Sequence, residues 1–177
     1  MVIKGKKVNL RPFQMKDAKK TLAWRNDPTT RFLAMIHPYP VTKEMEQDWL
    51  KGILSDTSNR SITFAIETAA DRKLIGNFHL RDIQWIHRRA WLGITIGDDS
   101  ERGRGYGEEA MRLGLEYAFR TLNLNKILLE VISSNKGAIR LYERLGFIKE
   151  GLLKKQFYFD NKYFDVLIYS LFGFGLR

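Results

Sequence analysis

The chain has 177 residues, no cysteine and a formal net charge of +10 at pH 7. This length fits one domain spanning 1–177, and the absence of cysteine excludes disulfides, thiolate metal sites and a cysteinyl-enzyme intermediate. The histidines, His37, His79 and His87, do not share the spacing of metal ligands, so no metal site is expected.

The positive charge favours anionic ligands, such as phosphates, acidic peptides or nucleic acid. Because Lys and Arg are spread along the whole chain without a basic tail, nucleic acid is the weaker interpretation. No apolar stretch is long enough to span a bilayer, and the first residues lack the apolar segment of a secretory signal. We therefore expect a cytoplasmic protein without a membrane partner.

Apolar periodicity and turn residues predict alternating elements in the first half of the chain. Residues 17–25 indicate a helix that ends at Asn26-Asp27-Pro28, because the residue before a proline avoids helical angles. A second helix is expected over 44–54, after a loop at 37–40. The strands expected in this half cover 7–13, 61–67, 73–82 and 90–96.

The clearest helix of the second half covers 107–122, where apolar residues recur at helical spacing. The other expected elements are a buried strand at 126–132, a helix at 135–145 capped by Gly146, and strands at 151–158 and 163–172 around an Asp160-Asn161 turn. This order predicts an α+β fold in which helices flank a mixed sheet. The sheet should be antiparallel early and parallel where helices join the strands.

A glycine-rich loop, Arg102-Gly-Arg-Gly-Tyr-Gly107, comes immediately before the helix expected at 107–122. Its glycines let the backbone approach a ligand closely, and the free N–H groups of a helix start attract phosphate. The spacing differs from the dinucleotide and P-loop motifs, and a flexible basic turn is the alternative interpretation.

Three polar residues mark the strand and helix that follow the loop. Glu130 lies in a strand that otherwise appears buried, and burial would raise its pKa toward neutrality and suit it as a general base. A glutamate in a salt bridge at the open end of the strand is the alternative. Asn135 and Tyr142 are seven residues apart on one helix and so point the same way. Their simpler interpretations are an N-cap and a core tyrosine.

The arrangement resembles the GNAT acetyltransferase superfamily, whose carrier is acetyl-CoA. The loop fits the pattern Gln/Arg-x-x-Gly-x-Gly/Ala, and the resemblance covers essentially the whole chain. It implies a GNAT-like mixed sheet, loop amides that hold the CoA pyrophosphate, and a strand end that lies along the pantetheine arm. The cofactor-binding residues implied by the resemblance are Thr95, Ile96, Gly97, Arg102, Gly103, Arg104, Gly105, Tyr106, Gly107, Glu108 and Asn135.

Residues 129–147 are similar to bacterial ribosomal-protein alanine N-terminal acetyltransferases, through Leu-Glu-Val, Ser-Asn, Leu-Tyr-Glu and Leu-Gly-Phe. In those enzymes the residues that match Glu130, Asn135 and Tyr142 accept a proton, contact acetyl-CoA and donate a proton, respectively. The resemblance therefore implies that Glu130 and Tyr142 are the catalytic residues.

Other segments resemble other branches of the superfamily. Leu10-Arg-Pro-Phe followed by Asp17 resembles the opening of ribosomal-protein serine/alanine N-acetyltransferases. His87-Arg-Arg-Ala90, residues 122–127 and the final Phe164-Asp-Val segment resemble spermidine N-acetyltransferases. Those spermidine enzymes carry a glutamate at the position where this chain has Trp91.

We expect direct transfer of acetyl from acetyl-CoA to a primary amine, with a ribosomal-type protein N-terminus preferred as the acceptor. The +10 charge and Trp91 both disfavour spermidine. Acidic residues of the first two helices could form a local pocket for a polyamine, so spermidine stays as the alternative. A non-catalytic acetyl-CoA-binding or nucleic-acid-associated domain is a third interpretation. The oligomeric state stays open, a homo-oligomer included.

Overall fold

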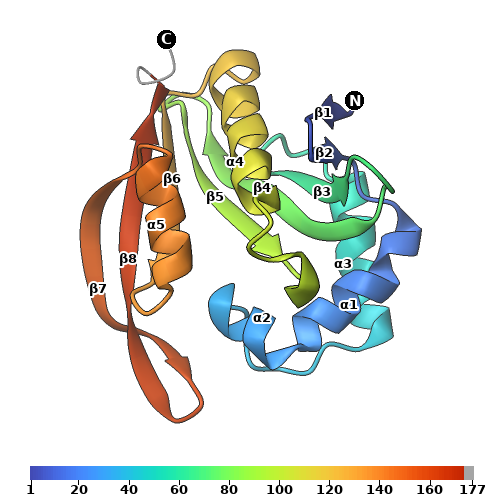
Figure 1. Ribbon diagram of the computed structural model, residues 1–177, viewed down its shortest axis with the longest axis horizontal. Helices are drawn as coiled ribbons and strands as arrows, with labels where there is room; N and C mark the ends of the chain where they lie inside the picture. Colours follow the sequence, from blue (N-terminus) through green and yellow to red (C-terminus); the bar gives the residue numbers. More distant parts are fainter. Residues whose placement is uncertain (174–177) are drawn as a thin grey trace.

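The protein is described by a computed structural model over residues 1–173, so residues 174–177 of the expected domain 1–177 lie outside the described part. An eight-stranded sheet in the order β1-β2-β3-β4-β5-β6-β8-β7 forms its centre (Figure 1). Neighbouring strands are antiparallel except β5 and β6, which are parallel and joined through a helix. The predicted α+β fold with a mixed sheet is confirmed.

The strands have the following bounds: β1 (Ile3–Lys4), β2 (Val8–Arg11), β3 (Ile62–Thr68), β4 (Leu74–Gln84), β5 (Arg89–Ile96), β6 (Lys126–Ile132), β7 (Ile148–Phe159) and β8 (Lys162–Phe172). The helices are α1 (Ala18–Asn26), α2 (Pro28–Leu33), α3 (Lys43–Ser55), α4 (Tyr106–Glu116) and α5 (Lys136–Arg144). A π-helical turn, η3 (Tyr117–Thr121), continues α4. Within the described part of the chain, no helix is long and apolar enough to cross a membrane.

Helix α2 was not predicted from the sequence. The expected end of the preceding helix is correct, but Pro28 also begins the next helix, because proline suits the first helical position, where an N–H has no partner. The Asp27 carboxylate caps α2 by accepting a hydrogen bond from the Thr30 N–H at 2.7 Å.

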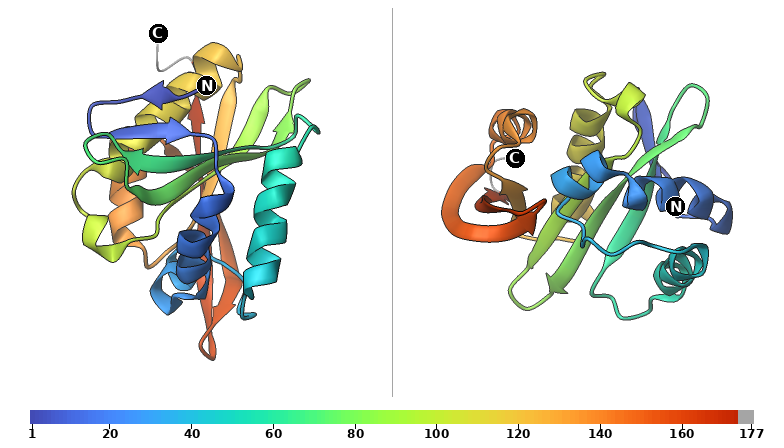
Figure 2. Two further views of the ribbon diagram at one scale, coloured as in Figure 1. Left: turned by 90° about the vertical axis from the view of Figure 1, so that its right-hand side faces the viewer. Right: turned by 90° about the horizontal axis from the view of Figure 1, so that it is seen from below.

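The helices cover both faces of the sheet, with α4 and α5 on one face and α1 and α3 on the other (Figure 2). Successive side chains of β3 point to opposite faces of the sheet, so the strand contributes to the core on both sides. Phe64 and Ile66 are buried in the larger core cluster that includes α4 and α5, whereas Ala65 belongs to the cluster with Trp24 of α1 and Leu50 of α3.

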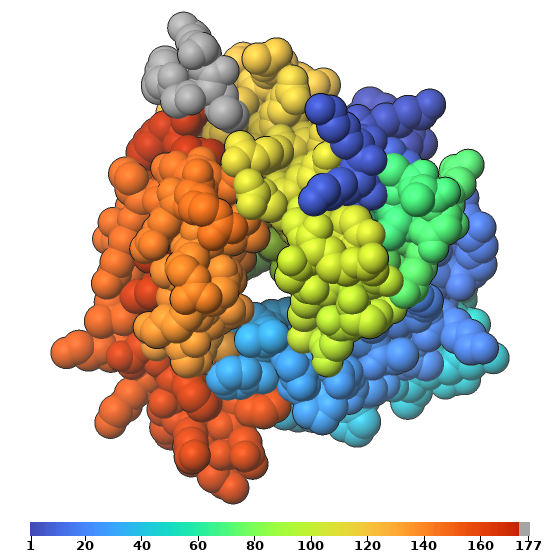
Figure 3. Space-filling model, in the orientation of Figure 1, coloured from blue at the N-terminus to red at the C-terminus, as the bar shows by residue number. Residues whose placement is uncertain are grey.

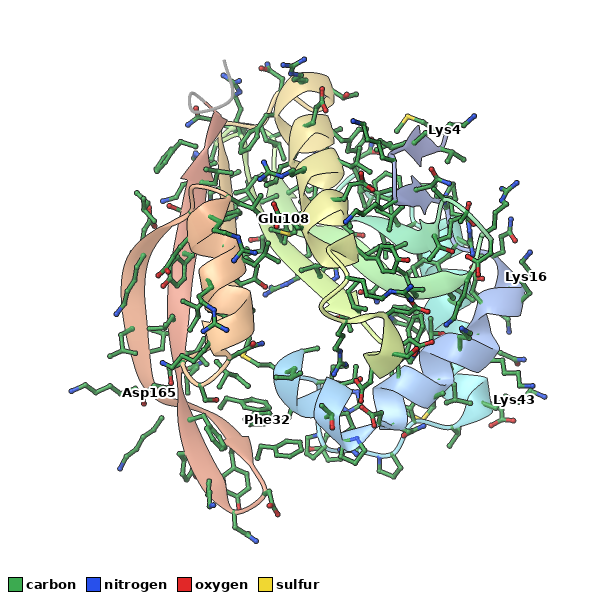
Figure 4. All side chains as sticks on the ribbon, viewed as in Figure 1. Lys4, Lys16, Phe32, Lys43, Glu108 and Asp165 are labelled. Atoms are coloured by element: carbon green, nitrogen blue, oxygen red, sulfur yellow. The ribbon has the colours of Figure 1, made fainter. Side chains whose placement is uncertain are left out.

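The C-terminal strands form the expected hairpin, with Asp160 and Asn161 both at positive φ (46° and 59°) in its turn. The hairpin inserts β8 between β6 and β7, an order that was not predicted. Its far end contacts α2, where the ring of Phe32 lies 5.0–6.3 Å from those of Phe157, Phe159 and Phe164 (Figure 4).

Glu109 in the first turn of α4 fixes the N-terminal β1–β2 hairpin. Its carboxylate accepts hydrogen bonds from the backbone N–H groups of Lys6, Lys7 and Val8, at 3.1, 2.6 and 2.7 Å. Three otherwise unpaired donors therefore depend on one side chain, and this contact joins residues about a hundred positions apart in the sequence.

We predict that Glu109→Gln lowers the free energy of unfolding by about 1 to 2 kcal/mol, because an amide NH₂ then faces backbone donors. Urea unfolding measures this change. Glu116→Gln on the same helix is the control, since the Glu116 side chain is 60% exposed and its ion pair within residues 1–173 is with Arg120. Equal losses in the two variants would contradict a special role for Glu109.

Candidate functional site

A cavity of about 750 Å³ occupies the gap between β5 and β6. The two strands pair only where residues 89–91 face residues 126–128, and they separate beyond Trp91. The space-filling view shows the molecule hollowed between α5, the loop before α4 and α2 (Figure 3). The cavity is therefore bounded by segments that lie between Thr30 and Arg144 in the sequence.

Most of the residues implied by the resemblance line this one cavity. They are Thr95, Ile96, Arg102, Gly103, Gly105, Gly107, Glu108, Glu130, Asn135 and Tyr142. Residues from β5, from α4 and the loop before it, from β6 and from α5 are thus brought together. Whether each contacts a ligand or takes part in catalysis stays a prediction.

Gly97, Arg104 and Tyr106 do not line the cavity. The Gly97 N–H donates to the Ile75 carbonyl at 2.9 Å, and a Cβ at Gly97 would lie 2.1 Å from the Trp24 ring, so this glycine allows close packing instead. The Arg104 guanidinium lies over the Tyr106 ring at 5.4 Å, and both residues line a separate surface pocket.

The glycine loop has the backbone shape of an anion site. Gly103 and Gly105 have positive φ (74° and 83°), a conformation that favours glycine, and Gly105 is the N-cap of α4. The helix begins at Tyr106, one residue earlier than expected. Arg102 braces the loop, because its guanidinium donates to the Ile96 carbonyl at 2.9 Å and to Thr30 of α2 at 3.1 Å.

Backbone groups of β5 face the gap beyond the point where β6 separates. Because Gly97 hydrogen-bonds to β4 and antiparallel pairs alternate, Leu92, Ile94 and Ile96 direct their N–H and C=O groups away from β4. All three line the cavity. The arm of acetyl-CoA carries amide and carbonyl groups that need hydrogen-bond partners. The unpaired backbone groups along this edge of β5 can supply them, so the edge fits acetyl-CoA.

Glu130 faces the side of the sheet opposite to α5. Its neighbours Leu129 and Val131 are buried under α4 and α5, and alternation along β6 turns Glu130 the other way. The expected burial is wrong: 29% of the side chain is exposed, and its carboxylate accepts a hydrogen bond from Arg81 at 3.2 Å. The salt-bridge alternative for Glu130 is therefore correct as a description of its surroundings.

Asn135 is the N-cap of α5, as the simpler interpretation expected. Its Oδ1 accepts a hydrogen bond from the Ala138 N–H at 3.1 Å. The residue also lines the cavity. Because the cap uses the oxygen, the side-chain NH₂ is left to donate to a ligand.

Tyr142 lies on the α5 side of the gap and packs against Phe147, with ring centroids 5.9 Å apart. Only 8% of the residue is exposed, and burial raises the pKa of its phenol to about 12. Within residues 1–173 its hydroxyl has no hydrogen-bond partner, yet the residue lines the cavity. The phenol therefore keeps its proton at neutral pH and has it available for a ligand.

His79 and Arg81 of β4 also line the cavity and were not predicted as site residues. The His79 ring lies over Gly93, where an added Cβ would come within 2.3 Å of it. Burial and the charge of Arg81 lower the pKa of His79 to about 4, so the ring is neutral at pH 7. In the sequence these polar residues alternate with the apolar residues Phe78 and Leu80, which are buried. This alternation could have indicated that His79 and Arg81 face the other side of the sheet.

The carboxylates that line the cavity are all ion-paired within the described chain. Lys73 and Arg104 hold the pKa of Glu101 below its usual range. Arg112 and Arg144 lower the pKa of Glu108 in the same way. Figure 4 shows Glu108 in the space between α4 and α5. The third carboxylate, Glu130, pairs with Arg81.

Residues 1–173 contain no group of three His, Cys, Asp or Glu side chains arranged to hold a metal ion. The side chains of the cavity instead offer hydrogen bonds and charge. The arrangement suits binding of a phosphate-bearing carrier and proton transfer, the two tasks of an acyl transfer between a thioester and an amine.

Comparison with known proteins gives a consistent result. Residues 7–148 match the family described as an acetyltransferase (GNAT) domain. The chain is 36% identical to spermidine N(1)-acetyltransferase of Vibrio cholerae over 129 residues, which cover 73% of this chain and 72% of the relative. A Bacillus subtilis protein, YdaF, provisionally named a ribosomal N-acetyltransferase, is 31% identical over 57% of this chain and 55% of its own.

The fold also matches a crystal structure of spermidine N-acetyltransferase from Vibrio cholerae in complex with CoA and spermine. The TM-score is 0.87 at 29% sequence identity, and the match covers 94% of this chain and 96% of that one. The similarity in fold therefore extends over nearly the whole chain.

We predict that Gly105→Val weakens acetyl-CoA binding about tenfold or more, since a left-handed conformation costs a β-branched residue about 1 to 2 kcal/mol. Calorimetric titration with CoA measures the effect. Gly52→Ala is the control, because a Cβ at this helical glycine meets nothing within 4 Å. An unchanged affinity in Gly105→Val would remove the loop from the binding site.

Proposed function

We propose that this chain, which belongs to the acetyltransferase (GNAT) family and uses acetyl-CoA, delivers the acetyl group to a primary amine that enters from the Glu130 face of the sheet. The observation that carries this proposal is the passage between β5 and β6. The glycine loop, Asn135 and Tyr142 lie toward the α4–α5 face, and Glu130 lies toward the other. Carrier and acceptor would therefore meet in the gap from opposite sides.

The reaction transfers acetyl directly, so the carbonyl–sulfur bond breaks as the carbonyl–nitrogen bond forms. Glu130, directly or through a water, takes the proton that the ammonium group must lose, because only a neutral amine is nucleophilic. The N–H groups of Ile94 and Ile96 stabilise the negative charge that develops on the carbonyl oxygen. Tyr142 donates its proton to the departing thiolate, and the second proton that the nitrogen loses as it becomes an amide restores the phenol, directly or through solvent.

Of the two acceptors left open by the sequence, the comparisons favour the polyamine. Both the sequence match and the structural match from Vibrio cholerae are named as spermidine acetyltransferases, and the ribosomal-type relative matches a smaller share of the chain. The comparisons therefore do not support the protein N-terminus that we expected from the sequence as the acceptor. The family consists of acetyltransferases, so the non-catalytic interpretation is set aside.

We predict that spermidine is acetylated with a higher kcat/KM than a peptide that begins with Ala or Ser. Leu33 at the end of α2 and Met35 just beyond it line the cavity, and Phe32 of α2 is held by the β7–β8 hairpin, so these apolar walls favour a slim amine. Initial rates at 0.15 M salt test this order, because charges farther apart than about 8 Å are then screened. Faster peptide acetylation would restore the N-terminal acceptor.

We predict that Tyr142→Phe lowers kcat about 10² to 10⁴-fold while changing CoA affinity little, because it removes a proton donor and keeps the ring. Steady-state kinetics and calorimetry separate the two effects. Tyr169→Phe is the matched control: Tyr169 is 3% exposed and donates to Glu143 at 3.0 Å, away from the cavity. If both variants turn over like the wild type, Tyr142 is a packing residue.

A further inference from the structure

Arg81 offers the acceptor side of the cavity a guanidinium with most of its donors unused. The side chain is 52% exposed, and within residues 1–173 its hydrogen bond goes to the Glu130 carboxylate at 3.2 Å. A guanidinium has five N–H donors in a planar fork that matches carboxylate and phosphate oxygens. Arg81 can therefore bind an anion while it stays beside Glu130.

Trp91 supports this guanidinium. The Arg81 Cζ lies 5.6 Å from the centroid of the Trp91 ring, within the range of a cation–π contact. The indole therefore holds the guanidinium in place on the acceptor side of the cavity.

The charges around Arg81 also favour an anion over a polycation in this part of the cavity. His79, on the same strand and face as Arg81, is neutral. Glu101 and Glu108 are each paired with two cationic side chains, and Glu130 is paired with Arg81 itself. A polycation entering this cavity would meet carboxylates that are already neutralised, while an anion would meet unused donors on Arg81.

We propose that the preferred acceptor is a small zwitterion whose reacting amine lies a few bonds from an anionic group, either a carboxylate or a phosphate. The ammonium group binds Glu130 and the anion binds Arg81, as two charge-assisted pairs. Because the two side chains are in contact, the two charged groups of the acceptor must also be close together. This inference rests on the proposed function, acetyl transfer to a primary amine at this site, and it ranks the zwitterion above spermidine, which stays the better of the two acceptors that the sequence left open.

Four amines test the inference. β-Alanine and phosphoethanolamine supply the carboxylate and the phosphate, n-propylamine lacks an anion, and spermidine is a polycation. In the wild type, kcat/KM is expected to be about tenfold or more higher for at least one zwitterion than for n-propylamine or spermidine. The better of the two zwitterions identifies the anion.

Arg81→Gln is expected to abolish that preference, so that in this variant neither zwitterion reacts faster than n-propylamine. The same variant should improve the use of spermidine severalfold, because Glu130 loses its cationic partner. A folding defect lowers every rate, so a gain with spermidine cannot come from unfolding. Arg60→Gln is the matched control: Arg60 pairs with Asp82 at 3.3 Å, is 70% exposed and does not line the cavity.

Failures of the two proposals are distinguishable. Equal wild-type rates for the four amines, or a zwitterion preference that survives Arg81→Gln, overturns the inference and leaves acetyl transfer to an amine intact. If no amine is acetylated, the proposed function fails. Calorimetric titration of the two zwitterions into CoA-loaded protein then decides the inference, which stands if binding is lost in Arg81→Gln and falls if the wild type binds neither.

Discussion

β5 and β6 hydrogen-bond to each other over residues 89–91 and 126–128 and then separate, which interrupts a sheet that is otherwise continuous across eight strands. Backbone N–H and C=O groups inside a fold need partners, and an interrupted ladder leaves some without one. On the β5 side these groups are the carbonyl of Leu92 and the N–H and C=O groups of Ile94 and Ile96, and Arg102 satisfies only the carbonyl of Ile96. A ligand with its own amide and carbonyl groups can complete this edge, so the binding site follows from the break.

Packing on each side keeps the break open. β6 pairs with β8 along its whole length. The edge of β6 that faces away from β5 is therefore fully hydrogen-bonded, and β6 is fixed to the β7–β8 hairpin. Two links then tie α2 to both sides of the gap: Thr30 bonds Arg102 of the glycine loop, and the Phe32 ring contacts the hairpin. Because interiors are close-packed, these contacts resist small shifts, and the cavity keeps its shape for two substrates.

Local patterns were enough to predict most of the helices and strands and the glycine loop, because periodicity, caps and turn residues act over a few positions. The orientation of Glu130 was harder to predict. Its neighbours on the same face, Leu128 and Ile132, are apolar and buried, so the strand appeared buried on both faces. Helix α2 has only six residues, too few for a periodic pattern, and its first proline was taken only as the end of α1. A motif also does not show which of its residues face a ligand, as Gly97 and Tyr106 illustrate.

Two arginine–carboxylate clusters in this protein differ in what they can do. Arg11 is 6% exposed and holds Asp17 and Glu67 at 2.8 and 2.6 Å, so removing one partner would leave a buried charge uncompensated. The Arg81–Glu130 pair is partly exposed and makes a single contact at 3.2 Å, a kind of pair that contributes about 0 to 1 kcal/mol to stability. A ligand can therefore separate Arg81 from Glu130 at little cost to the fold. Since fold similarity does not fix substrate choice, the second pair is the place where this chain can differ from relatives that share its sheet.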